Sequence, residues 1–131
     1  MKLVVDASVA IAAAATPVGY QRFRRIGLVA PPLLWIEAAS ALHATMWRRE
    51  ITRQQAELMR ERVARAPIEC VEPTGLAHEA WVIADELGWA KTYDANYLSL
   101  ARLLDCRVVT LDARLRRGAD RSGLVIGPEE V

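Results

Sequence analysis

The N-terminal stretch MKLVVDASVAI, residues 1 to 11, constrains the fold more than any other part of the chain. Leu3, Val4 and Val5 form a short apolar run, and Asp6 and several small residues follow it directly. Such a run is typical of a strand buried on both faces of a parallel sheet, and the Ala-rich segment after it indicates a helix. Ligand sites in open α/β folds gather at the carboxyl edge of the sheet. Asp6 is therefore the first candidate site residue, although an N-cap of the following helix is the simpler explanation of a single Asp.

The same order of strand, acid and short helix recurs near the C-terminus. Residues 107 to 110 form another β-rich run, and Asp112 lies just past its end. Because the carboxyl ends of parallel strands lie at one edge of a sheet, we expect Asp6 and Asp112 to share that edge. Asp94 lies in the first turn of a further predicted helix, capped by Thr92 or by Asp94 itself, where the helix dipole favours a carboxylate. Taken singly, Asp94 and Asp112 are more often caps than ligands.

A fourth acid lies in an apolar segment. Residues 33 to 49 follow Pro31-Pro32 and are predicted to form a largely buried helix, because they are apolar almost all round. Glu37, Ser40 and His43 are spaced three apart on it. Either this stripe faces solvent, or Glu37 points into a cleft where a buried carboxylate needs a cation. We interpret His43 as structural.

The remaining pattern predicts an α/β fold: a central, mostly parallel sheet of four to five strands flanked by helices as α/β/α, in one domain over residues 1–131. Thr52 is a plausible cap of the helix over 51–65, with Leu58 and Val63 inward, and Gly88 ends the helix over 76–87. The other expected elements are helices over 8–15 and 18–26, strands over 28–30 and 68–71, and a helix from about 93 with Tyr93, Tyr97, Leu100 and Leu104 as its buried stripe.

Composition excludes several classes of protein. No apolar run approaches the roughly 20 residues of a membrane span, and the N-terminus does not resemble a signal peptide, so we expect a cytoplasmic protein without a membrane partner. Cys70 and Cys106 are far apart, which argues against a zinc site and for reduced thiols. Seventeen basic and sixteen acidic residues give a net charge of +1, which is neutral on nucleic-acid binding. Fifteen of the seventeen are Arg, clustered at 22–25, 48–53, 60–65 and 114–117; these clusters permit an anionic partner without requiring one.

Four blocks together resemble the PIN-domain ribonucleases, and more narrowly the VapC-type toxins of prokaryotic toxin–antitoxin pairs. The blocks are VVDASVAI, PPLLWIEAASAL, TYDANYLSLA and VVTLDARL, in this order over almost the whole chain. The resemblance implies that Asp6, Glu37, Asp94 and Asp112 form an acidic quartet that is both catalytic and metal-binding. It also implies that Thr110 and Ser8 assist this site by hydrogen bonding.

The chemistry of such a quartet is consistent with the resemblance. Neighbouring carboxylates repel one another unless a cation neutralises them, and oxygen ligands suit Mg²⁺, with Mn²⁺ possible. The expected reaction is hydrolysis of RNA by water, which the resemblance implies leaves 5′-phosphate and 3′-hydroxyl ends. The resemblance further implies a homodimer and a cognate VapB-type antitoxin, whose C-terminal segment would pack into an apolar groove.

Two other functions stay open. The first is a phosphohydrolase with an acidic pocket, although such enzymes of the haloacid-dehalogenase type need Asp-x-Asp where this chain has Asp6-Ala7-Ser8. The second is a non-catalytic PIN-like module that binds RNA or a partner, because a fold does not by itself imply activity. The intact quartet favours an enzyme. A secondary role for Asp85, an acid at the unfavourable end of its helix, is also open.

Overall fold

The computed structural model describes residues 1–131, and five parallel strands form its single sheet. The strands follow the order β3-β2-β1-β4-β5, which confirms the predicted α/β fold with a parallel sheet. Their bounds are β1 Lys2–Val5, β2 Gly27–Ala30, β3 Ile68–Cys70, β4 Arg107–Val109 and β5 Val125–Ile126. In the central register, Val4 lies between Val29 of β2 and Val108 of β4. All three side chains are buried, as expected of strands covered on both faces.

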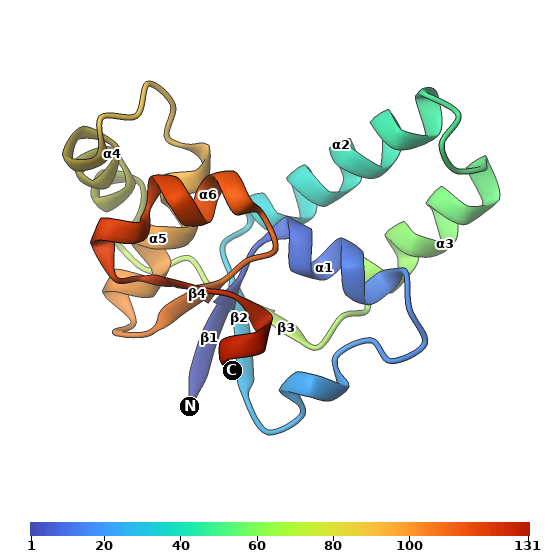
Figure 1. Ribbon diagram of the computed structural model, residues 1–131, viewed down its shortest axis with the longest axis horizontal. Helices are drawn as coiled ribbons and strands as arrows, with labels where there is room; N and C mark the ends of the chain where they lie inside the picture. Colours follow the sequence, from blue (N-terminus) through green and yellow to red (C-terminus); the bar gives the residue numbers. More distant parts are fainter.

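Six α-helices cover the sheet as two groups (Figure 1). In this view α1, α2 and α3 lie to the right of the strands, and α4, α5 and α6 lie to the left. The helix α5 packs against β1 and β4 as well as against α4. None of the helices is both long enough and apolar enough to cross a membrane. Their bounds are α1 Ala7–Ala14, α2 Leu33–Trp47, α3 Arg53–Ala64, α4 Leu76–Leu87, α5 Tyr93–Leu103 and α6 Ala113–Gly118.

The expectation that residues 33 to 49 form a largely buried helix is wrong. The helix α2 ends at Trp47, and it buries only the face that carries Leu34, Ala38 and Leu42. Ile36 is 66% exposed and Trp47 is 78% exposed. The reason is that α2 and α3 form a helical hairpin that extends beyond the end of the sheet (Figure 1), so the outer side of α2 has no layer above it.

Three smaller predictions are also corrected. Leu58 is 47% exposed, because α3 turns Ala56 and Val63 toward the core and a residue two positions after Ala56 lies on the opposite side of the helix. Tyr93 is 57% exposed, because it is the first residue of α5 and lies outside the layer that buries Tyr97. The basic segment 18–26 forms only a 3₁₀ turn over Gln21–Phe23. The left-handed backbone of Gly19, with φ of 56°, interrupts a longer helix.

The predicted helix boundaries elsewhere follow local capping. Thr52 accepts a hydrogen bond from the Gln55 backbone N–H and forms a full capping box at the start of α3. Gly88 has the left-handed conformation that ends α4. Both cysteines are free thiols.

Candidate functional site

Asp6 lies between the end of β1 and the start of α1 and is only 5% exposed. Its backbone is extended and its Oδ1 accepts the Val9 backbone N–H at 3.2 Å, so it is the N-cap of α1. The same Oδ1 accepts a hydrogen bond from the Ser8 hydroxyl at 2.6 Å. The Thr110 hydroxyl donates to the other oxygen, Oδ2. A cap needs only the first of these bonds, so the two hydroxyls show that Asp6 is held more firmly than capping requires.

Ser8 and Thr110 are themselves oriented by backbone groups. The Thr110 Oγ1 accepts the Asp112 backbone N–H at 3.0 Å, and the Ser8 Oγ accepts the Leu111 backbone N–H at 3.0 Å. Because these N–H groups occupy a lone pair of each hydroxyl, each hydroxyl proton is directed at Asp6. The Leu111–Ser8 bond and the Thr110–Asp6 bond also join the segments that follow the neighbouring strands β1 and β4. They therefore fix the spacing of the two loops that carry Asp6 and Asp112.

Asp112 caps the short helix α6. Its Oδ1 accepts the backbone N–H groups of Arg114, at 2.9 Å, and Leu115, at 3.3 Å. Its Oδ2 receives no hydrogen bond from the protein, and the side chain is half-buried. One oxygen of Asp112 thus holds the backbone, and the other is available to a ligand.

Glu37 is half-buried and turns away from the exposed side chains of Ser40 and His43. Its Oε1 accepts a hydrogen bond of 2.6 Å from the Tyr97 hydroxyl. Tyr97 is a fully buried residue of α5, so this bond joins α2 to α5. Of the three polar residues, Ser40 and His43 therefore face solvent, whereas Glu37 faces α5. Sequence reasoning assigned Tyr97 only to the core, although a buried tyrosine hydroxyl normally has a polar partner.

Asp94 lies in the first turn of α5 and is half-buried. Its carboxylate accepts no hydrogen bond from the protein, and Thr92, the N-cap residue, makes no side-chain cap bond. Asp94 lines a groove of about 430 Å³ that lies between the start of α5 and the helix α6. Of the four acids it is the one with both oxygens free.

Electrostatic repulsion links the four acids in a closed ring. Asp112 and Glu37 both interact with Asp6, and Asp94 interacts with both Glu37 and Asp112. Burial is the main cause that raises the pKa of Asp6, of Glu37 and of Asp94, and this repulsion raises each further. Hydrogen bonds from Ser8, Thr110 and Val9 oppose the rise for Asp6, and the Tyr97 bond opposes it for Glu37. The structure therefore brings the four acids to one region at the carboxyl edge of the sheet.

The acids repel one another without converging on a single point. No three Asp, Glu, His or Cys side chains of the chain are close enough together to hold one metal ion in this structure. The donor set nevertheless has the chemistry of a hard cation site, because it consists of carboxylate and hydroxyl oxygens. A positive charge at the centre of the ring would relieve the repulsion that raises the three pKa values.

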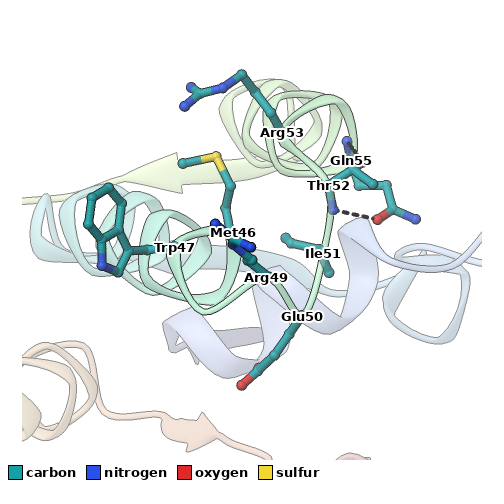
Figure 2. Close-up of a pocket in the computed structure, with 8 residues that line it drawn as sticks. All are labelled: Met46, Trp47, Arg49, Glu50, Ile51, Thr52, Arg53 and Gln55. Carbon is teal, nitrogen blue, oxygen red and sulfur yellow. Dashed lines mark hydrogen bonds between the residues drawn. The ribbon is translucent and has the colours of Figure 1, made fainter.

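A larger hollow, of about 700 Å³, lies at the turn between α2 and α3, far along the hairpin from β1 (Figures 1 and 2). Glu50 is its only acid, and Figure 2 shows Glu50 and Arg53 pointing in opposite directions away from the turn. Glu50 pairs with the exposed Arg48 at 2.9 Å. This hollow therefore lacks the carboxylates that a hydrolytic metal site needs. Asp85 is exposed on α4 and is not among the acids that interact in the ring.

Comparison with known proteins agrees with the fold of this chain. The family model described as PIN domain matches residues 3–121. Among solved structures, PAE2754 from Pyrobaculum aerophilum is 25% identical with a TM-score of 0.74, and the match covers 99% of this chain and 91% of that one. A toxin–antitoxin complex from Klebsiella pneumoniae has a TM-score of 0.68 at 14% identity, over 96% of this chain and 97% of the other, and shows the same fold. No curated protein sequence matches the chain.

Proposed function

Because this chain belongs to the PIN-domain family, we propose that it is a metal-dependent endoribonuclease and the toxin of a toxin–antitoxin pair. PIN domains are generally nucleases. The observation that carries the proposal is the ring of four acids at the carboxyl edge of the sheet, Asp6, Glu37, Asp94 and Asp112, in which burial and repulsion from neighbouring acids raise the pKa of Asp6, Glu37 and Asp94. Residues 1–131 would act as one cytoplasmic PIN-like domain.

In this proposal Asp6, Asp94 and Asp112 hold a divalent ion, Mg²⁺ or Mn²⁺, and Glu37 contributes partly through water. Mg²⁺ keeps several waters when it is bound, so carboxylates that lie apart can still share one hydrated ion. When bound, such an ion lowers the pKa of a water molecule and stabilises negative charge on a phosphodiester. The products would carry 5′-phosphate and 3′-hydroxyl ends.

The protein groups around the ring have distinct tasks in this reaction. Ser8 and Thr110 keep the Asp6 carboxylate in one orientation, since each donates a hydrogen bond to a different oxygen. Tyr97 does the same for Glu37. The oxygens of Asp94 and Asp112 that accept no hydrogen bond from the protein remain available to a metal-bound water or to the substrate. A fixed set of charges costs no reorganisation when negative charge moves in the transition state.

The toxin assignment adds two partners, a VapB-type antitoxin and a second copy of the chain. One similar structure is a toxin–antitoxin complex, which supports the first partner. Exposed apolar side chains support a protein partner as well: Ile36 and Trp47 on α2 and Leu58 on α3 are all more than 40% exposed. We propose that the antitoxin segment docks on these side chains, as an amphipathic helix docks on apolar residues of its partner.

Cleavage of single-stranded RNA with and without MgCl₂ tests the proposal. We expect cleavage that EDTA abolishes and that Asp6→Asn and Asp94→Asn each reduce at least about 100-fold, because each removes a charge from the ring. Asp120→Asn is the matched control, since Asp120 is exposed and outside the ring. Hydrolysis of small phosphomonoesters without RNA cleavage would indicate a phosphohydrolase. RNA or protein binding without any hydrolysis would indicate a binding module.

A further inference from the structure

The groove beside Asp94 has walls from three parts of the chain. The loop after α4 contributes Trp89 and Lys91, the first turn of α5 contributes Tyr93 and Asp94, and α6 contributes Arg114 and Gly118. Its volume of about 430 Å³ lies in the range of small-molecule sites. Since Asp94 belongs to both the groove and the acidic ring, a ligand in the groove lies directly beside the acids.

Two aromatic residues line this groove. Tyr93 is more than half exposed, and its ring is available for stacking. Trp89 is half-buried, and its indole lies so close to Gly118 that a Cβ atom there would approach the ring at 3.2 Å. The indole therefore packs against Gly118 of α6 and forms one side of the groove. Aromatic rings stack with every nucleic-acid base, because each base has a π face.

Two cations complete the groove. Lys91 and Arg114 are both exposed, and neither forms an ion pair with an acidic side chain, in contrast to Arg48, Arg65, Arg102 and Arg116. Arg114 is close enough to Asp94 to lower the pKa of that carboxyl, against the larger effect of burial. With Asp94 ionised, the side chains of the groove still carry a net positive charge. They can therefore attract a phosphate that the acids alone would repel.

We propose that this groove binds one nucleotide of a single-stranded RNA, with its base stacked on Tyr93 and its phosphate held by Lys91 and Arg114. The identity of the ligand as RNA depends on the proposed nuclease function. The combination of an exposed aromatic ring with two unpaired cations favours a nucleotide over an acidic peptide, which would need no ring. A nucleotide seated here directs the next phosphodiester of the strand toward the acidic ring.

Binding of a fluorescein-labelled hexauridylate, measured by anisotropy in EDTA, tests this site separately from catalysis. We expect Tyr93→Ala to weaken binding about 5- to 150-fold, since stacking on an aromatic residue is worth about 1–3 kcal/mol per base. Tyr93→Phe keeps the ring and should bind as wild type does, whereas Tyr93→Leu keeps an apolar side chain and should bind weakly. Trp81→Ala is the matched control, because Trp81 is an exposed aromatic residue of α4 outside the groove.

The salt dependence of the same binding tests the cations. Arg114→Gln should reduce the slope of log affinity against log salt by about 0.7, the value for one phosphate contact on a single strand. Arg117→Gln, an exposed residue of the same helix outside the groove, should leave the slope unchanged.

Three results distinguish the two proposals. Wild-type affinity in both Tyr93→Ala and Tyr93→Leu would overturn the nucleotide site even if the protein cleaves RNA, and so would a wild type that does not bind the hexauridylate. Ring-dependent binding without cleavage under any metal condition would overturn the nuclease and leave the nucleotide site standing.

Discussion

Replacing Thr110 by Val should destabilise the protein through two specific hydrogen bonds. The hydroxyl of this fully buried residue donates to the Asp6 carboxylate and accepts the Asp112 backbone N–H at 3.0 Å. A bond to a charged group contributes about 1.5–3 kcal/mol and a bond between neutral groups about 1 kcal/mol. Valine has nearly the same shape and can make neither bond. We therefore expect a loss of about 2–4 kcal/mol, which lowers the Tm by about 10 °C in a chain of this size.

Urea unfolding monitored by circular dichroism measures this loss, with Thr110→Ser as the matched control. Serine keeps the hydroxyl and loses one methyl group, so it should cost about 1 kcal/mol or less. The loss in Thr110→Val should also shrink when Asp6 is already Asn, because part of it depends on the Asp6 charge. If Thr110→Val and Thr110→Ser unfold at the same urea concentration, the hydroxyl does not hold Asp6 and this interpretation fails.

Three further predictions concern the buried polar groups. The folded-state pKa of Asp6 is raised above its ordinary value of 3.8, so above this pH the folded protein holds a proton that the unfolded chain has lost. The Tm of the metal-free protein, relative to that of Asp6→Asn, should therefore fall as the pH rises from about 4. MgCl₂ should restore the Tm at neutral pH, and an unchanged Tm with MgCl₂ would contradict a metal site. Tyr97→Phe removes the hydrogen bond that lowers the pKa of Glu37. The acidic limb of the pH profile for RNA cleavage should therefore move to higher pH. If this limb does not move, Glu37 does not titrate in the reaction. The Tyr20 hydroxyl is buried without a hydrogen-bond partner, and burial raises the pKa of Tyr20 to about 12. Tyr20→Phe should therefore keep the free energy of unfolding or raise it by up to about 1 kcal/mol. A clear decrease of this free energy in urea unfolding would show that the hydroxyl has a partner.

Local sequence patterns were sufficient to predict most of the elements. The strands β1, β2 and β4 are apolar runs that end at a polar or small residue, and Thr52 and Gly88 mark helix ends by capping rules. Asp6 illustrates why the alternatives were hard to separate: the residue does cap a helix, and it also belongs to the acidic ring. Helix capping and a functional role use the same carboxylate, so spacing alone could not choose between them.

The features that sequence patterns missed depend on contacts between distant segments. The bond from Tyr97 to Glu37 joins residues 60 positions apart, and no local period reports it. Ile36 and Trp47 are exposed because of where the hairpin of α2 and α3 lies relative to the sheet. The periodicity of α2 alone does not predict this position. The strand β5 has two residues, too few for an alternating or apolar pattern to be recognised.

The two edge strands of the sheet restrict how the protein can associate. The outer strands β3 and β5 have only three and two residues, and Pro128 and two acidic residues follow β5 almost immediately. Such short, interrupted borders offer few free backbone groups on which a foreign strand could align. Sheet extension, the usual route to β-rich aggregates, is therefore blocked at both margins. We therefore expect copies of this chain that come together to meet through helical surfaces, where Trp47, 78% exposed, is the most exposed large apolar side chain.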